Sequence, residues 1–206
     1  MSSQASRPSS GIAADGSATL RPDGPLVGRF VHVEPLSERH REGLRAAADE
    51  DPGIFRYMVY DRDFNRWFDE ALASKDVAFA VVSASDTTVL GSTRYLSYEP
   101  AHHRVEIGWT WLRPSAWNSG ANAETKLLLL QHAFETHGLQ RVEFKTDARN
   151  ERTRRALLAL GAEFEGIFRK HMMLPTGPRD SAWYGITDDG WPAVKAHLTE
   201  RLARKG

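Results

Sequence analysis

One stretch of the sequence, residues 106–124, combines a strand-like segment, a loop of small residues and the start of an apolar helix. Ser119, Gly120 and Ala121 form the loop, and their small side chains let a ligand approach the main chain closely. Free N–H groups and the dipole at such a helix start attract anions, and phosphate oxygens suit them well. The spacing matches neither a Walker loop nor the G-x-G-x-x-G fingerprint of dinucleotide-binding proteins. Taken alone, the stretch fits an ordinary strand-to-helix connection equally well.

The segments that would position this loop alternate between strand-like and helix-like patterns. Strands are predicted over residues 29–36, 77–83, 89–98, 104–112, 141–146, 163–174 and 181–187. Helices are predicted over residues 37–48, 63–73, 122–136 and 150–160, and from residue 188 or 189 to about residue 204. This order predicts a single α/β domain whose mixed, mostly antiparallel sheet is flanked by helices.

The first 27 residues differ in composition from the rest of the chain. They are rich in Ser, Ala, Gly and Pro, and the first aromatic residue is Phe30. Such a segment buries too little apolar surface to offset the entropy lost on ordering. We therefore predict a disordered N-terminal tail over residues 1–27 and one folded domain over residues 28–206.

Charge and composition exclude several classes of protein. The 206 residues include 27 Lys+Arg and 27 Asp+Glu, so no net charge attracts nucleic acid or an anionic membrane. The apolar run Val77–Val82 is far shorter than the roughly 18 residues needed to span a bilayer. The absence of Cys excludes disulfides and thiolate chemistry, and His132 and His137 lack the spacing of a zinc pair. We expect a cytoplasmic protein with no metal, no nucleic-acid partner and no membrane contact.

Three segments together resemble one family. Val105–Trp109 (VEIGW) lie on a strand, Trp117–Glu124 (WNSGANAE) enter a helix, and Asn150–Thr153 (NERT) precede Leu160–Ala162 (LGA). In this order and at these distances they resemble the GCN5-related N-acetyltransferases (GNAT), most closely the branch that acetylates N-terminal amines of ribosomal proteins (RimJ/RimL type) and related small molecules. The resemblance covers roughly residues 28–198 and implies a GNAT-like domain.

The resemblance implies a site for acetyl-CoA as co-substrate. The family's pyrophosphate loop reads Gln/Arg-x-x-Gly-x-Gly/Ala, which falls here on Trp117, Gly120 and Asn122, so the central glycine alone matches. Main-chain groups of residues 109–112 are expected to bind the pantetheine arm as an added strand would. The residues expected at the acetyl-CoA site are Trp109, Thr110, Trp111, Leu112, Trp117, Asn118, Ser119, Gly120, Ala121, Asn122, Asn150 and Thr153.

The implied reaction needs a base for the amine and a donor for the oxyanion. Glu106 is the expected catalytic base, because a carboxylate among apolar neighbours has a raised pKa. An exposed position on the strand is the other interpretation of this residue. The main-chain N–H of Trp109 would face the oxyanion if the strand bulges near Gly108.

The leaving CoA thiolate needs a proton donor. Thr153 is the expected catalytic acid, because it matches a position where this branch of the family usually carries Ser. Many family members use a tyrosine four residues further along, where this chain has Leu157. Thr153 also fits a purely structural role in the first turn of its helix, and Asn150 fits that of an N-cap.

Two segments suggest contacts with the amine acceptor. Tyr95 and Trp109 lie in segments that border the acceptor cleft of family members, where aromatic rings would form a slot for a peptide N-terminus or an aminoacyl group. Arg94 is a candidate partner for a carboxylate or phosphate of the substrate. Packing in the core for the rings, and a surface position for the arginine, are the alternatives.

The sequence therefore predicts an acetyl-CoA-dependent N-acetyltransferase that transfers acetyl directly to a primary amine of a protein N-terminus, a peptide or an aminoacyl small molecule. An acyltransferase using another acyl-CoA, such as succinyl-CoA, stays open. So does a non-catalytic acyl-CoA-binding or regulatory module, which Leu157 and Asn122 would favour. The partner is expected to be this amine acceptor, and a homodimer is left open.

Overall fold

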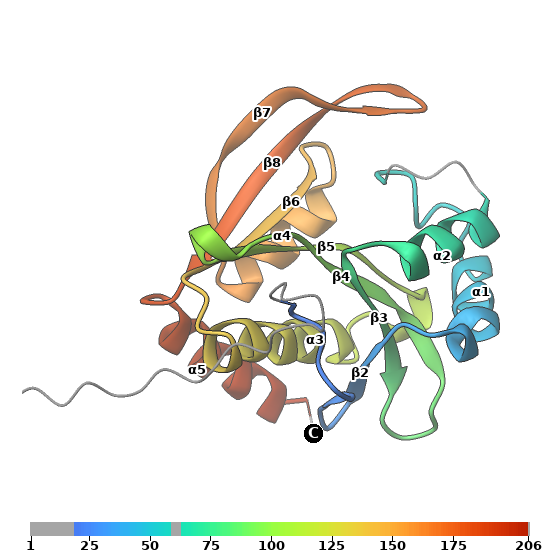
Figure 1. The fold of residues 1–206 in the computed structure, drawn as a ribbon, viewed down its shortest axis with the longest axis horizontal. Coiled ribbons are helices and arrows are strands. Elements are labelled where there is room, and N and C mark those ends of the chain that lie inside the picture. The colour runs from blue at the N-terminus through green and yellow to red at the C-terminus, as the bar shows by residue number, and fades with distance from the viewer. Residues whose placement is uncertain (1–18, 59–62, 206) are drawn as a thin grey trace, which may run out of the picture.

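Eight strands form one sheet in the order β1-β2-β3-β4-β5-β6-β8-β7. The computed structural model describes residues 19–58 and 63–205. The strands are β1 (Leu26–Val27), β2 (Val31–Pro35), β3 (Val77–Ser83), β4 (Val89–Glu99), β5 (Arg104–Leu112), β6 (Arg141–Asp147), β7 (Glu163–Leu174) and β8 (Gly177–Thr187). The long β7–β8 hairpin arches away from the rest of the domain (Figure 1).

Five α-helices connect or follow the strands. They are α1 (Arg41–Asp49), α2 (Phe64–Ala73), α3 (Ala121–Gln131), α4 (Glu151–Leu160) and α5 (Trp191–Ala203). Short 3₁₀ turns occupy Glu38–His40, Pro100–His102 and Pro114–Ala116, and a π-helical segment, His132–Thr136, extends α3. Within the described residues, no helix is both long enough and apolar enough to cross a membrane.

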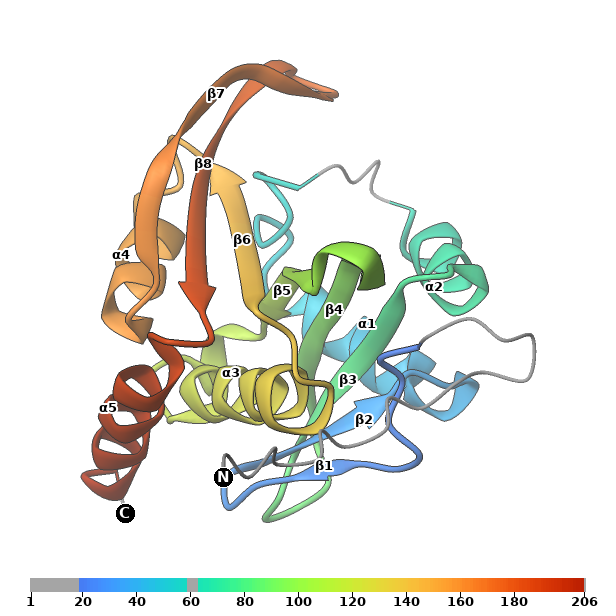
Figure 2. The same ribbon diagram turned by 60° about the vertical axis from the view of Figure 1, so that its left-hand side comes forward.

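The middle of the sheet is buried on both faces. Along β3, Phe79 and Val81 pack into the core beneath α3 and α5, whereas Ala78, Ala80 and Val82 pack against α1 and α2. Successive side chains of a strand point to opposite faces, so a strand covered on both sides reads as a continuous apolar run. Figure 2 shows α3 on one side of the central strands and α1 on the other. The predicted α/β architecture is confirmed.

Among the described strands, β5 and β6 form the one parallel pair, and all other neighbouring strands are antiparallel. Strands β5 and β6 separate after three residue pairs. Arg104, Val105 and Glu106 pair with Arg141, Val142 and Glu143, and no pairing follows. Between its pairs with β4 at Gly108 and Trp111, β5 carries one extra residue, and Trp109 has a φ of 48°. A bulge of this kind bends its strand. The ends of β5 and β6 therefore diverge.

The predicted tail is too long at its C-terminal end. Leu20 is 1% exposed in the core, and Leu26 pairs with Val33 in the β1–β2 ladder. Composition alone did not predict this order, because it comes from long-range contacts. Leu20 packs in the core, and Leu26 joins the edge of the sheet next to α3. Residues 1–18 lie outside the described part of the chain.

Glu124, in the first turns of α3, fastens the β1–β2 turn. Its buried carboxylate accepts the main-chain N–H groups of Arg29, Phe30 and Val31 at 2.9, 2.6 and 2.8 Å. A Cβ added at Gly28 would lie 2.5 Å from the same carboxylate, so a glycine is needed there. This contact ties the edge of the sheet to the helix that begins at the small-residue loop.

Several predicted boundaries shift by a few residues. Ser37 starts a 3₁₀ turn before α1, the helix predicted to Thr136 ends as α-helix at Gln131, and Gly190 precedes α5 where Asp188 or Asp189 was expected. Asn150 and Gly161 do bound α4 as predicted. The strand predicted to begin at residue 181 begins at Gly177, because the tight turn before it continues the hairpin ladder.

The Glu124 contact predicts a stability difference. Glu124→Gln places a buried NH₂ group against main-chain N–H groups, so at least one of the three hydrogen bonds is lost and the NH₂ group lacks that partner, which costs about 1–3 kcal/mol of unfolding free energy. Urea denaturation measures this difference. Glu200→Gln, which removes an exposed i,i+4 pair with Arg204, is the control and should change stability by less than about 0.5 kcal/mol. Equal stability of the two variants would contradict the assigned role of Glu124.

Candidate active site

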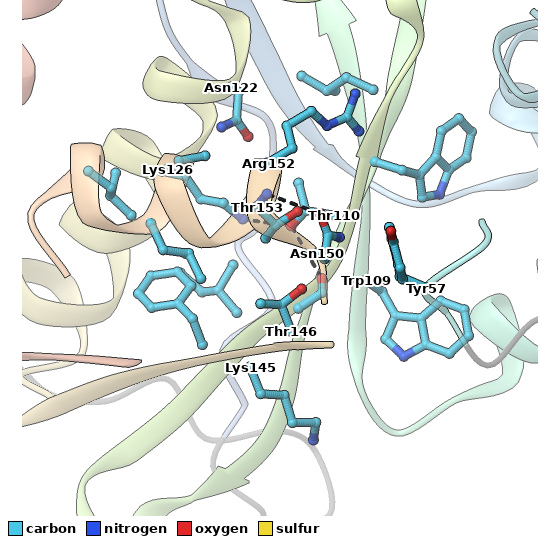
Figure 3. Close-up of a pocket in the computed structure, with 18 of the residues that line it drawn as sticks. Tyr57, Trp109, Thr110, Asn122, Lys126, Lys145, Thr146, Asn150, Arg152 and Thr153 are labelled. Carbon is cyan, nitrogen blue, oxygen red and sulfur yellow. Dashed lines mark hydrogen bonds between the residues drawn. The ribbon is translucent and has the colours of Figure 1, made fainter. Parts of the chain in front are cut away.

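The diverging ends of β5 and β6 open a cleft of about 500 Å³. Strands β5 and β6 form two of its walls, and α3 and α4 contribute side chains from its sides (Figure 3). Arg201 and Leu202, at the end of α5, also line it. Of the residues expected at the acetyl-CoA site, those that line the cleft are Trp109, Thr110, Trp111, Leu112, Trp117, Asn118, Gly120, Asn122, Asn150 and Thr153.

Two residues of the predicted loop face elsewhere. The Ser119 hydroxyl donates to the Ala116 carbonyl at 2.7 Å and accepts the N–H of Ala121 at 3.2 Å. Ser119 and Ala121 border a second, separate hollow beside Phe30. Neither side chain lines the cleft, because the Ser119 hydroxyl satisfies polar groups of the loop itself. The expectation that main-chain groups of Ser119 and Ala121 bind the ligand stays a prediction.

The loop itself leaves the cleft open. Gly120 has a φ of 101°, a left-handed conformation that disfavours any side chain. The indole N–H of Trp117 donates to the Leu112 carbonyl at 2.7 Å, which holds the ring beside the cleft. Two cations lie next to the loop: the Arg152 guanidinium is 4.0 Å from the Trp117 ring centroid, and the Lys205 ammonium donates to the Asn118 carbonyl.

Glu106 is buried at the point where β5 and β6 separate. Its side chain is 2% exposed, so the alternative of an exposed strand position is excluded. One carboxylate oxygen accepts from the Lys145 ammonium at 2.7 Å. Burial raises the pKa of Glu106, and the attraction of Lys145 offsets this only in part. A more basic carboxylate thus faces the cleft beside a cation that favours its ionised form.

Thr153 and Asn150 both line the cleft at the start of α4. The Asn150 side chain accepts the Thr153 main-chain N–H at 3.1 Å, as expected of an N-cap. Capping and ligand contact are therefore compatible in Asn150. Leu157, one turn further along, also lines the cleft and offers no proton.

Of the three residues expected to contact the amine acceptor, Trp109 lines the cleft, whereas Tyr95 and Arg94 do not. Tyr95 is 1% exposed, and its hydroxyl donates to the Leu129 carbonyl at 2.5 Å, so it belongs to the core and the prediction of substrate contact is wrong. Its strand is covered on both faces, which the sequence pattern alone does not reveal. Arg94 is 6% exposed and does not line the cleft; its guanidinium lies between the rings of Trp67 and Trp109. Trp109 does line the cleft.

Sequence reasoning missed several polar residues of the cleft. Arg179 on β8 is 6% exposed and donates to the Tyr57 carbonyl at 3.1 Å, and both residues line the cleft. Lys126 on α3 is 5% exposed and donates to the Thr110 hydroxyl at 2.6 Å. Neither basic residue carries a signal in the sequence, because only the fold brings its side chain into the cleft. Among the described residues, no group of three or more potential metal ligands occurs.

Comparison with known proteins identifies the family. The family model of the acetyltransferase (GNAT) domain matches residues 31–163. The uncharacterized N-acetyltransferase YoaA of Bacillus subtilis (strain 168) is 29% identical over 98 residues, which are 48% of this chain and 55% of that protein. A solved GCN5-related N-acetyltransferase from Brucella melitensis is 30% identical with a TM-score of 0.82, over 87% of this chain and 86% of that one. The chain belongs to the GNAT acetyltransferase family.

These findings confirm the family that the three sequence segments predicted. The match to YoaA spans about half the length of that curated relative. Mycobacterium smegmatis RimJ, solved in complex with CoA-disulfide, shares the fold at 19% identity and a TM-score of 0.72, over 88% of this chain and 98% of that one. GNAT acetyltransferases use acetyl-CoA and act on an acceptor substrate, so the cleft is the candidate active site.

The Glu106–Lys145 pair predicts a pKa change. Lys145→Met removes the nearby positive charge, so the pKa of Glu106 should rise further. Carbon-13 NMR titration of labelled glutamate carboxyls measures it, with Glu106→Gln used to assign the resonance. Lys195→Met, which removes an exposed lysine paired with Glu135, should leave the Glu106 titration unchanged. An unshifted pKa in the Lys145 variant would refute the coupling.

Proposed function

We propose that the chain transfers the acetyl group of acetyl-CoA directly to a primary amine, carried by a protein N-terminus, a peptide or an aminoacyl small molecule. The observation that supports this most is one cleft that holds a buried carboxylate, a strand bulge and an open glycine loop, contributed by Glu106, Trp109 and Gly120. The chain has no Cys, so a covalent intermediate on a thiol of the enzyme is excluded, which favours direct transfer.

The loop end of the cleft suits the phosphates of CoA. Gly120 lets a ligand approach the start of α3, where the helix dipole favours negative charge. Arg152 and Lys205 add positive charge beside the loop, from α4 and from the end of α5. Asn122 lines the same end at a position where a small residue is usual in the family, and its amide offers a further hydrogen bond.

Glu106 is proposed to accept the proton of the attacking amine, directly or through a water. Burial makes its carboxylate more basic than usual, while Lys145 keeps that carboxylate ionised. Both properties are required of a base that works near neutral pH.

The remaining groups act on the thioester, which supplies an activated acetyl group when it is bound. The bulge takes the N–H of Trp109 out of the regular β4–β5 ladder, and we assign this N–H to the oxyanion. The Thr153 hydroxyl, on the opposite wall of the cleft, is assigned as the hydrogen-bond donor to the leaving sulfur.

A non-catalytic acyl-CoA-binding module is the second candidate, and Leu157 favours it because it replaces a common acid. Thermal shift with acetyl-CoA, CoA and NADH, followed by thiol release with a panel of amines, separates the two. Stabilisation by both CoA species and thiol release with at least one amine support the enzyme. Binding without release for every amine favours the module, and stabilisation by neither CoA species contradicts both.

The role of Glu106 predicts a kinetic effect. Glu106→Gln should lower turnover by about 10²–10⁴-fold and leave the affinity for acetyl-CoA nearly intact, because only proton transfer is lost. Steady-state thiol release and calorimetry measure the two quantities. Glu200→Gln, which removes only an exposed i,i+4 pair with Arg204, should keep near wild-type turnover. Equal turnover of parent and Glu106→Gln would remove Glu106 from the base role.

The backbone of the loop predicts an effect on binding. Gly120→Val should weaken CoA binding by about tenfold or more, because a β-branched residue resists a φ of 101° and shifts the start of α3. An added Cβ meets only ordinary contacts at 3.6 Å, so the effect arises from the backbone. Gly138→Val serves as the control. Gly138 has a φ of 61°, so a valine there strains the backbone in a similar way at a position outside the loop. Calorimetric titration with CoA should show weakened binding in the Gly120 variant alone; equal losses would contradict the role of the loop.

A further inference from the structure

Lys126 places an ammonium group inside the cleft. It lies on α3, is 5% exposed, and lines the cleft together with Thr110 and Thr153. Its Nζ donates to the Thr110 hydroxyl at 2.6 Å and lies 5.8 Å from the Phe144 ring centroid, so it reaches into the gap between β5 and β6. Figure 3 shows Lys126 and Thr153 approaching Thr110 from different helices. The residue before Thr110 is Trp109, whose N–H we assign to the oxyanion.

The charge of Lys126 has no acidic partner in the described part of the chain. The other charged residues that line the cleft are Asp76, Glu106 on β5, Lys145 on β6, Arg152 on α4, Arg179 on β8, and Arg201 and Lys205 at the end of the chain. Glu106 is already paired with Lys145. Burial alone lowers the pKa of Lys126 to about 7, so its ammonium releases a proton readily near neutral pH.

A leaving thiolate needs such a group. A threonine hydroxyl is a much weaker acid than a thiol, so Thr153 delivers a proton to sulfur only if another group replaces that proton at the same time. Leu157, on the same helix face, has no proton to give. An unpaired buried cation in the same cleft both attracts the developing negative charge and carries an acidic proton.

We propose that Lys126 is the catalytic acid that protonates the CoA thiolate as it leaves, a role that rests on the proposed acetyltransferase function. When the C–S bond of the thioester breaks, its electron pair goes to sulfur. The sulfur takes a proton from the Lys126 ammonium, directly or through the hydroxyl of Thr110 or Thr153, and Lys126 becomes a neutral amine. The acceptor amine loses one proton to Glu106, and exchange with solvent restores both side chains.

The thiol pKa of bound CoA tests this proposal without turnover. Ultraviolet absorbance reports the thiolate, and because the chain has no Cys, CoA is the sole thiol in the sample. The same titration with acetyl-CoA, whose sulfur is blocked, subtracts the tyrosines. In the wild-type protein the bound thiolate and the Lys126 ammonium form an ion pair, and the thiolate keeps the lysine protonated above its pKa in the free protein. The pKa of the bound thiol should therefore lie about one unit or more below its value in Lys126→Met.

Two further variants separate charge from proton transfer. Lys126→Arg keeps a positive charge that does not dissociate, so the thiol pKa should stay low while turnover falls about 10²-fold, as in Lys126→Met. Lys145→Met removes one charge from the same cleft and should leave the thiol pKa unchanged. Thermal shift with CoA confirms that each variant folds and binds.

The outcomes distinguish this proposal from the proposed function. Equal thiol pKa values in wild type and Lys126→Met, in a protein that binds CoA and releases thiol, overturn the role of Lys126 alone. An equal change of the thiol pKa in Lys126→Met and Lys145→Met also overturns it, because the change would then report the overall positive charge of the cleft and not Lys126 itself. Full turnover in Lys126→Arg contradicts the proton transfer. A wild-type protein that binds no CoA overturns both proposals.

Discussion

The candidate site depends on the point where the parallel ladder between β5 and β6 stops. Three residue pairs hold the strands together, and beyond Glu106 and Glu143 they separate. At the end of a ladder, main-chain groups lose their partners and must find others, in water or in a ligand. The bulge at Trp109 turns β5 further from its neighbour. A regular, fully paired sheet at this place would leave no cleft, and the two helices that flank it would have nothing to enclose.

That geometry also explains why charged groups are tolerated inside the domain. Glu106 and Lys126 are both nearly inaccessible to solvent, and burial favours the neutral form of each side chain. The pKa of Glu106 is raised and the pKa of Lys126 is lowered, so both groups titrate closer to neutral pH than usual. Lys145 restrains the shift of Glu106, whereas Lys126 has a hydroxyl as its partner. A proton acceptor and a proton donor thus line the same cleft, which favours a catalytic role over binding alone.

Local patterns predicted most of the elements, and the resemblance to the GNAT family implied the residues of the candidate site. Strand and helix periods fixed β3, β5 and β7, and the glycine loop with Glu106 followed from residue types within one short stretch. Tyr95 and Leu20 were misjudged, and Lys126 was not singled out, for a shared physical reason. Whether a side chain lies in the core, at an edge or in a cleft depends on which distant segment covers it. Tyr95 meets α3, Leu20 meets the π-helical turn through His132, and Lys126 meets β5.

A crystal structure of the protein with CoA tests most directly whether the gap between β5 and β6 is a site for a thioester carrier. The proposed function predicts density for the pantetheine arm along residues 109–112, the phosphates beside Gly120, and the sulfur between Thr110 and Thr153. CoA bound instead in the hollow beside Phe30, or a cleft that stays empty at saturating CoA, would contradict it.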